Sequence, residues 1–251
     1  MRKMNIFNFR DISGYKNKYG EELQPNLIFR GGALNNISTE DGQYMEEELG
    51  ITYVLDYRDV NEASEAQDIK FLRAHYERIS ALRIKRYNET GFDFGSLLKE
   101  QINPERLEFF TNYLKEGYKT MALDNPAYRR LFDLLLKGER VYFHCTAGKD
   151  RTGVSAFLVM MALGMSEEDG IKEYLLSNNY LKKFAEDFYV RYHIPEELRE
   201  GCASLLMVNE KYLKCTIDSI KEKYKDYDEY FEMEYGLDKS KRMLLRKKYC
   251  K

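Results

Sequence analysis

The stretch VYFHCTAGKDRTG, Val141 to Gly153, decides the fold, because it has the pattern of a buried strand, a tight loop and the start of a helix. The apolar segment GVSAFLVMMALG continues from Gly153 and predicts a buried helix that ends near Gly164. A cysteine kept only for packing behaves as a small hydrophobe and has no reason to lie among charged residues. Cys145 therefore indicates a chemical site between the strand and the helix.

A loop of this kind places its own N–H groups, and those of the helix N-terminus, where they can bind an anion. Arg151 would add a bidentate contact to two oxygens of that anion. The helix end and the nearby cations favour a thiolate at Cys145, which could attack the phosphorus of a phosphate ester and form a phosphocysteine. The residues expected to surround the phosphate, besides Arg151, are Thr146, Ala147, Gly148, Lys149 and Asp150.

Three neighbours have supporting roles in this interpretation. Thr152 can donate its hydroxyl to the sulfur, or it can simply cap the helix. His144 can fix the backbone of the loop. Lys149 can reach a second anionic group of the substrate, or it can be a solvated loop lysine.

Departure of an alkoxide or a phenoxide requires a general acid, and Asp150 inside the loop is the first candidate. Asp56 and Asp59 of the segment LDYRD are the reserves, because they should fall at the C-terminal end of a strand, on the ligand side of the sheet. Each of the two could instead form a salt bridge with Arg58, and for Asp59 this is the favoured interpretation.

The rest of the chain predicts an α/β fold, with a central, mostly parallel sheet flanked by helices. Short β-branched or aromatic runs predict strands at LIFR from Leu27, ITYVLDYR from Ile51, HYERI from His75 and RVYFH from Arg140. A helix is expected between Ser38 or Thr39 and Gly50. From about Ser166 the pattern is helical and rich in aromatic residues, which predicts a helical cap over the edge of the sheet.

We expect residues 1–251 to form a single phosphatase domain, because no linker or repeat is visible. Helical insertions near residues 82–128 and 180–215 are expected to form the walls or the lid of the active site. The four cysteines show no metal-binding spacing. No metal or other cofactor is expected.

The net charge is −2, so nothing in the overall charge argues for a nucleic acid partner. No run is apolar enough to span a membrane, and the N-terminus lacks the apolar region of a cleaved signal peptide. We therefore expect a cytoplasmic protein, with export by another route left open. The basic end KSKRMLLRKKYCK is compatible with a transient contact to an anionic membrane surface, although a solvated helix end explains it better.

The loop HCTAGKDRTG matches throughout the motif of the bacterial cysteine-dependent phosphatases that act on phosphotyrosine, on other phosphoamino acids or on phosphoinositides. NFRDISGY from Asn8, LIFRGGAL from Leu27, LGITYVLDYRDVNE from Leu49 and YLLSNNYL from Tyr174 resemble the other signatures of this family, in the same order. The resemblance implies a protein-tyrosine-phosphatase-like fold, a phosphocysteine mechanism and no metal. It assigns the nucleophile to Cys145, the phosphate-binding arginine to Arg151, and the loop acid and lysine to Asp150 and Lys149.

The sequence departs from the family pattern at one point, where FRGG replaces the more usual Phe-Arg-Ser-Gly. The chain has 0 tryptophans, so it cannot carry the tryptophan-proline-aspartate acid loop of another large group of tyrosine phosphatases. The expected substrate is a phosphorylated protein or a phosphoinositide. The alternative function is a binding module that holds a phosphorylated partner without turnover, and sulfur transfer is a third, weaker alternative.

Overall fold

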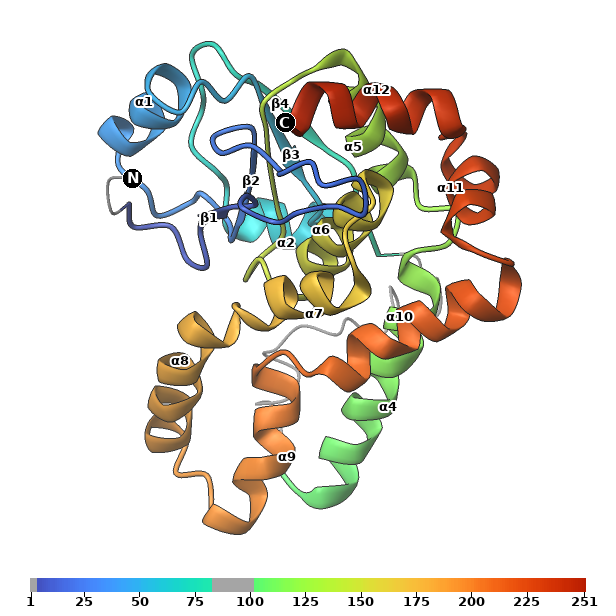
Figure 1. The fold of residues 1–251 in the computed structure, drawn as a ribbon. Coiled ribbons are helices and arrows are strands. Elements are labelled where there is room, and N and C mark those ends of the chain that lie inside the picture. Colours follow the sequence, from blue (N-terminus) through green and yellow to red (C-terminus); the bar gives the residue numbers. More distant parts are fainter. Residues whose placement is uncertain (1–3, 83–101) are drawn as a thin grey trace.

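The computed structural model describes residues 4–82 and 102–251 (Figure 1). Its sheet has the strand order β1-β2-β5-β3-β4, in which β2, β5, β3 and β4 are parallel and β1 pairs with β2 in the antiparallel direction. The strands are β1 (Arg10–Asp11), β2 (Ile28–Gly31), β3 (Tyr53–Asp56), β4 (His75–Arg78) and β5 (Val141–His144).

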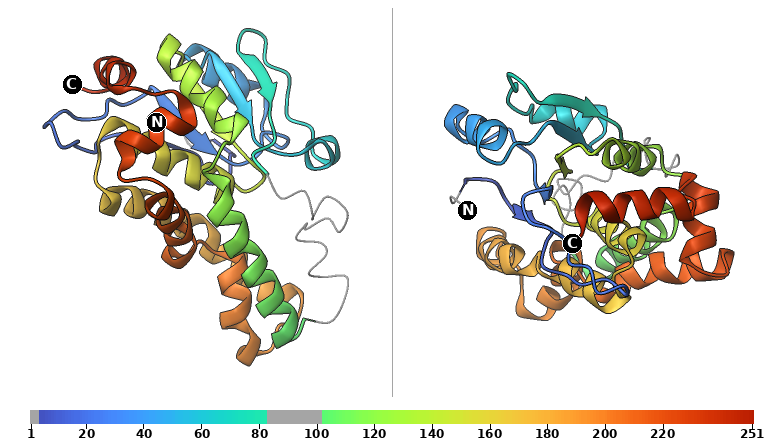
Figure 2. Two further views of the ribbon diagram at one scale, coloured as in Figure 1. Left: turned by 90° about the vertical axis from the view of Figure 1, so that its right-hand side faces the viewer. Right: turned by 45° about the horizontal axis from the view of Figure 1, so that its top comes forward.

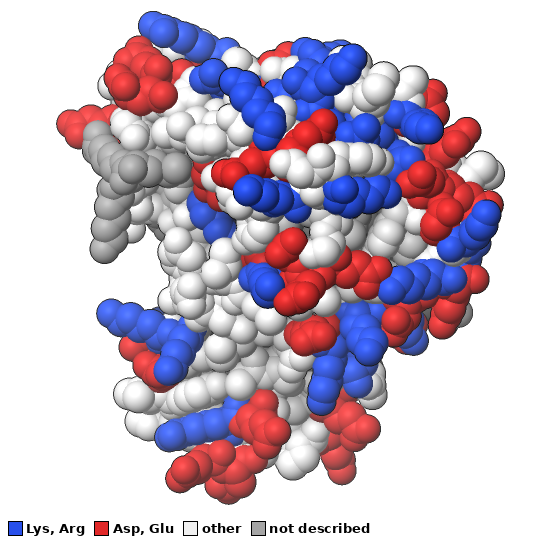
Figure 3. Space-filling view, in the orientation of Figure 1, with Lys and Arg blue, Asp and Glu red and all other residues white. Residues whose placement is uncertain are grey.

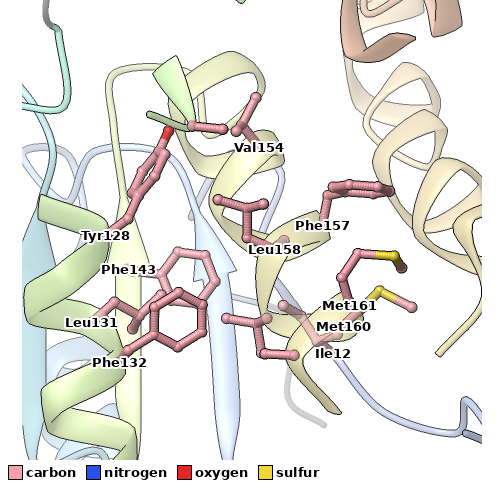
Figure 4. Close-up of a cluster of buried hydrophobic side chains, with 14 of the residues drawn as sticks. Ile12, Tyr128, Leu131, Phe132, Phe143, Val154, Phe157, Leu158, Met160 and Met161 are labelled. Carbon is pink, nitrogen blue, oxygen red and sulfur yellow. The ribbon is translucent and has the colours of Figure 1, made fainter. Parts of the chain in front are cut away.

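The central strand β5 is buried on both faces, and its side chains alternate between two cores. Val141 and Phe143 join the larger core, which packs under α5 (Pro126–Lys137) and α6 (Asp150–Leu163) (Figure 4). Tyr142 points to the opposite face and joins the core that includes Met45 of α1 (Thr39–Glu47). Helices therefore cover both faces of the sheet, as a parallel sheet requires.

Local signals in the sequence mark where the helices begin and end. Ser38 caps α1, and the N-terminus of α5 combines Asn125 as the cap with Pro126 in the first turn. Gly164 ends α6 in the left-handed conformation, with φ of 88°. The remaining helices are α2 (Val60–Glu65), α4 (Pro104–Met121), α7 (Glu167–Leu175), α8 (Asn178–Arg191), α9 (Glu196–Leu206), α10 (Glu210–Lys223), α11 (Tyr227–Tyr235) and α12 (Lys239–Tyr249).

Helices α4, α8 and α9 extend away from the sheet, and we call these three helices the helical lobe (Figures 1 and 2). They share a third hydrophobic cluster, which includes Phe110 of α4, Phe188 of α8 and Leu205 of α9. Leu114 contacts both this cluster and the larger core under the sheet. The lobe therefore has its own apolar core. It is joined along α4 to the rest of the molecule, the sheet with the helices that cover it, which we call the sheet half.

The predicted mostly parallel sheet with flanking helices is confirmed, including the buried helix that ends at Gly164. The short strand β1 was not predicted, because two residues are too few to show an alternating pattern. Of the insertion expected near residues 82–128, residues 83–101 lie outside the described part of the chain. Within the residues that are described, we find no helix with the length and apolarity needed to cross a bilayer.

Candidate active site

The loop that follows β5 lies at the carboxyl ends of the parallel strands, where ligands bind in open α/β sheets. Cys145 opens the loop and is only 2% exposed. Gly148 has φ of 65°, and a Cβ atom added there would come within 2.2 Å of the carbonyl oxygen of Gly31. Only glycine allows the loop to pass this close to the end of β2.

The carbonyl groups of the loop are bound from outside it. The amide of Ala33 donates to the carbonyl of Thr146 over 3.0 Å. The carbonyl of Gly148 accepts two bonds, one from Nδ2 of Asn8 at 2.8 Å and one from Nη2 of Arg30 at 2.7 Å. These donors turn the carbonyl groups outward, which leaves the opposite side of the loop to its N–H groups.

The N–H groups of the loop are available to an anion. In residues 4–82 and 102–251, no hydrogen bond is donated by the amides of Thr146, Ala147, Gly148 or Lys149. The next amides belong to the first turn of α6, which has no intrahelical partner for them. The loop and the positive end of α6 together form a cradle for a tetrahedral anion.

A buried ion-pair network of Glu173, Arg10 and Arg30 holds the backbone of this loop. The carboxylate of Glu173 on α7 binds two arginines. Nη1 of Arg30 lies 2.5 Å from Oε2, and Nε of Arg10 lies 2.6 Å from Oε1. Burial alone would raise the pKa of Glu173, but the charges of Arg30 and Arg10 outweigh it and lower the pKa. The carboxylate therefore stays ionised and fixes the arginine that holds Gly148.

Arg151 lies in the first turn of α6 and is held by a carboxylate that the sequence analysis did not identify. Its Nη1 and Nη2 donate to the two oxygens of Glu62 at 2.6 and 2.7 Å, and Thr146 Oγ1 donates to the same carboxylate at 2.7 Å. Burial would raise the pKa of Glu62, but the charge of Arg151 lowers it to about 2. Arg151 is thereby fixed as a cation at the mouth of the loop.

Glu62 also belongs to a local signal that was visible in the sequence. Asp59 caps α2 and its backbone amide donates to Glu62, which is the reciprocal pattern of a capping box. The spacing Asp59-x-x-Glu62 therefore predicts the start of a helix. That the same carboxylate reaches Arg151 depends on the fold and has no local signal.

Asp56, one of the two reserve acids, is the last residue of β3 and is fully buried. Arg58 binds it with Nη2 at 2.8 Å, and Tyr76 donates to it over 2.6 Å. Burial would raise the pKa of Asp56, but the charge of His144 and the bonds from Arg58 and Tyr76 hold it at about 2. A buried carboxyl with so low a pKa is ionised at neutral pH and has no proton to give, which argues against Asp56 as the general acid.

The interpretation of Asp59 as the partner of Arg58 is wrong. Asp59 uses its side chain to cap α2, and the guanidinium of Arg58 binds Asp56 and Asp68. Asp56, Asp68 and His144 bring possible ligand atoms within 4.8 Å of one another. Because Arg58 already bonds to both carboxylates, the cation of this cluster is the guanidinium rather than a metal ion.

His144, for which the sequence analysis predicted a role in fixing the loop, lies beside the backbone of Cys145. Its Nδ1 is 3.2 Å from the carbonyl oxygen of Cys145, and its Nε2 is 3.2 Å from Oδ2 of Asp68. Burial would lower the pKa of His144, but the carboxylates of Asp56 and Asp68 raise it above its ordinary value. The ring therefore lies between the backbone of the loop and the buried carboxylates of Asp56 and Asp68.

Asp150, the first candidate for the acid, is partly exposed at the start of α6. Its Oδ1 accepts a hydrogen bond from Oη of Tyr118 at 2.6 Å, and its Oδ2 lies 3.7 Å from Nζ of Lys149. Lys149 is not a solvated loop lysine, since its Nζ donates to the carbonyls of Leu205 and Leu206 at 2.6 and 3.3 Å. It binds the C-terminal end of α9, and its contact with a second substrate anion stays a prediction.

Thr152 is fully buried, and within the described residues its Oγ1 has no hydrogen-bond partner. It does not cap α6, because the N-cap position belongs to Lys149. A buried hydroxyl without a partner is costly unless a function uses it. The observation is consistent with the expected bond to a thiolate at Cys145.

The departure from the usual Phe-Arg-Ser-Gly pattern has a structural reason. A Cβ atom at Gly31 would lie 2.5 Å from Oη of Tyr142. That hydroxyl donates to the carbonyl of Gly32 over 2.5 Å. The tyrosine hydroxyl thus fills the space that a serine side chain would need.

Comparison with known proteins agrees with this geometry. A protein of Cupriavidus necator that carries a tyrosine-protein phosphatase name is 27% identical over 231 residues, which cover 90% of this chain and 80% of that protein. The triple specificity protein phosphatase PtpB of Mycobacterium tuberculosis is 29% identical over 191 residues, 69% of this chain and 67% of that protein. The model of the tyrosine phosphatase family matches residues 2–251. This match, over nearly the whole chain, shows that the protein belongs to the tyrosine phosphatase family.

Proposed function

We propose that this phosphatase hydrolyses phosphate monoesters, phosphotyrosine first among them, with Cys145 as the nucleophile, Arg151 as the phosphate-binding cation and Asp150 as the general acid. The observation that carries the proposal is the loop itself. Its carbonyl groups are bound from outside, its N–H groups donate to no other group of the described residues, and the buried thiol opens it. Such a cradle fits the charge that spreads over the equatorial oxygens of a transferring phosphoryl group.

The reaction has two steps. In the first, the thiolate of Cys145 attacks phosphorus, the bond from phosphorus to the leaving oxygen breaks, and Asp150 gives its proton to that oxygen. In the second, water attacks the phosphocysteine and gives a proton to Asp150. The phosphorus–sulfur bond then breaks, inorganic phosphate leaves and the thiolate is restored. The hydroxyl of Thr152 would stabilise the departing thiolate.

Arg151 and Glu62 act together in this scheme. The carboxylate occupies Nη1 and Nη2 of the arginine. Within the described residues, Nε of Arg151 makes no hydrogen bond to the protein, so this edge of the guanidinium remains for a phosphate oxygen. Glu62 thus sets the orientation of the fork, and the phosphate contacts its other side.

An aromatic substrate is favoured by the rings beside the loop. The carbonyl of Phe7 accepts a bond from the amide of Gly32, next to the carbonyl of Thr146. The ring of Phe7 contacts the ring of Tyr180 on α8, with centroids 6.3 Å apart. Both rings are partly exposed and could pack against the phenyl ring of phosphotyrosine.

The helical lobe supplies the other proposed wall of the site, within what we infer to be one phosphatase domain. Its contacts to Lys149 and Asp150 place α4 and α9 next to the loop. PtpB of Mycobacterium tuberculosis is named a triple specificity phosphatase. Phosphoserine, phosphothreonine and phosphoinositides are therefore further substrates to test on this chain.

The basic end of the chain gives little support to contact with a lipid surface. Arg242 of α12 pairs with Asp228 at 2.6 Å, and Arg246 lies 3.5 Å from Glu21. On the face drawn in Figure 3, positive and negative side chains lie among one another around α10 and α11. A surface of mixed sign attracts an anionic membrane only weakly.

The test compares phosphate release by the wild-type protein, Cys145→Ser and the control Cys215→Ser, with a chelator present. The substrates are a phosphotyrosine peptide, phosphoserine and phosphothreonine peptides, and soluble phosphoinositides. We expect Cys145→Ser to lose turnover by roughly a thousandfold or more, as removal of a nucleophile does. Cys215 is a half-buried cysteine of α10 and its replacement should leave turnover unchanged.

Two outcomes would contradict the proposal. Equal turnover by Cys145→Ser and the wild type would remove the thiol from the reaction. Tight binding of the phosphotyrosine peptide without release of phosphate would make the protein a phosphate-binding module instead. The relative rates on the peptides and the phosphoinositides decide the preferred substrate.

A further inference from the structure

A chain of two buried phenols ends on the proposed acid. Tyr118 of α4 is fully buried, and its Oη donates to Oδ1 of Asp150 over 2.6 Å. The same Oη lies 2.7 Å from Oη of Tyr174 on α7, which is also fully buried. The mechanism described above does not use either phenol.

Tyr118 is fixed in place from several sides. Its ring stacks on the ring of Tyr212 of α10, with centroids 5.5 Å apart and planes 21° apart. Thr216 of α10 donates its hydroxyl to the backbone carbonyl of Tyr118 over 2.6 Å. A side chain held in this way offers its hydroxyl in one direction, without a cost of reorganisation during the reaction.

The position of Tyr174 explains the last glycine of the loop motif. A Cβ atom at Gly153 would lie 2.7 Å from Cδ2 of Tyr174. The absence of a side chain at Gly153 therefore lets the ring pack against the first turn of α6. From there its hydroxyl reaches Tyr118, and Tyr118 reaches Asp150.

The protons of this chain can be assigned. Burial and the nearby charge of Asp150 raise the pKa of Tyr118 well above its ordinary value, so its hydroxyl stays protonated at neutral pH. It donates this hydrogen to Oδ1 of Asp150 and accepts the hydrogen of Tyr174. A neutral carboxyl group accepts better at its carbonyl oxygen than at its hydroxyl oxygen, so the bond from Tyr118 to Oδ1 favours the acidic proton on Oδ2.

We propose that Tyr118 is a positioning residue for the phosphatase reaction, because its bond to Oδ1 turns the carboxyl of Asp150 so that Oδ2 carries the transferred proton. The inference rests on the proposed role of Asp150. When the ester bond breaks, the bond from Oδ2 to hydrogen breaks and the proton moves to the leaving oxygen. In the hydrolysis step, a proton of the attacking water returns to Oδ2.

The experiment measures kcat/KM on phenyl phosphate, whose leaving group needs a proton, and on 4-nitrophenyl phosphate, whose leaving group departs without one. Tyr118→Phe should lower the rate on phenyl phosphate about tenfold more than the rate on 4-nitrophenyl phosphate. The matched control is Tyr230→Phe. This variant also removes a buried phenol hydroxyl, but its acceptor, the carbonyl of Ala122, keeps a bond from Tyr235. Its ratio of the two rates should equal that of the wild type.

A double variant tests whether Tyr118 acts through Asp150. Asp150→Asn removes the acid, so adding Tyr118→Phe to it should cause no further loss on phenyl phosphate. A further loss, or an equal loss on both substrates by Tyr118→Phe alone, would overturn the inference. Absence of Cys145-dependent turnover in the wild type would overturn the proposed function and this inference together. Normal turnover with an unchanged rate ratio in Tyr118→Phe would overturn the inference alone.

Discussion

The two halves of the site are built in different ways. On the sheet half, buried charges such as Arg30 and Glu173 hold the backbone of the loop, and through it the N–H groups that would face a phosphate. On the side of the helical lobe, α9 binds the side chain of Lys149 and α4 binds the side chain of Asp150. In the proposed mechanism, the core therefore fixes the part of the site that would meet every phosphate ester. Asp150 and Lys149, which would meet the rest of the substrate, depend on a lobe that has its own core.

The largest effect on the free energy of unfolding is expected from Glu173→Gln, which removes a buried charge from the sheet half. The substitution leaves the guanidinium groups of Arg10 and Arg30 without their shared carboxylate. Breaking a buried ion pair on one side should lower the free energy of unfolding by about 3–5 kcal/mol. Urea denaturation followed by circular dichroism measures it.

Glu168→Gln on the same helix is the matched control for that measurement. Glu168 is exposed and pairs with Lys172 on the surface. Loss of such a pair should change the free energy of unfolding by less than about 1 kcal/mol. Similar values for Glu173→Gln and Glu168→Gln would show that the buried network does not stabilise the sheet half.

The second prediction is the pH dependence of stability at Asp56. Its pKa is held at about 2 in the folded protein, below the ordinary 3.8, so its contribution is present above about pH 4 and is lost as the pH falls toward 2. Asp56→Asn should lower the free energy of unfolding by about 2 kcal/mol at pH 6. The difference from the wild type should shrink between pH 4 and pH 3.

Urea denaturation at several pH values measures this difference. The same variant should keep the rate ratio between phenyl phosphate and 4-nitrophenyl phosphate, because Asp56 does not act as the acid in our scheme. A loss confined to phenyl phosphate would restore Asp56 as the general acid. A stability difference that stays constant down to pH 3 would show that its ionisation does not stabilise the fold.

The sheet half was the more predictable half. The strand, loop and helix around Cys145 are contiguous, so periodicity and glycine positions were enough to locate the candidate nucleophile and Arg151. The partners of these residues were not visible in the same way. Arg30 and Glu173 are 143 positions apart, and no local pattern around either residue predicts that the two form an ion pair.

Errors arose where the fold decides between adjacent residues. Asp56 ends a strand and Asp59 follows three residues later, and the capping-box spacing of Asp59 and Glu62 did not by itself tell which of the two acids would bind Arg58. Burial made the difference, because Asp56 is the last residue of β3 and faces Arg58, Tyr76 and His144. In the lobe, the path from Tyr118 to Asp150 needs the packing of α4 against α10, which no single segment predicts.

The smallest predicted effect tests whether the lobe is joined to the loop through Lys149. Lys149→Met removes a charge that caps the C-terminal carbonyls of α9, an interaction worth about 1 kcal/mol. Hydrogen exchange of the α9 amides should become about fivefold faster, because their local opening becomes that much easier. The control Lys182→Met removes an exposed lysine of α8 and should leave the exchange rates of the α9 amides unchanged.

If hydrogen exchange in α9 is the same in Lys149→Met and the wild type, then α9 is held in place by apolar contacts alone. Lys149 would then be available to a second phosphate, as the sequence analysis expected.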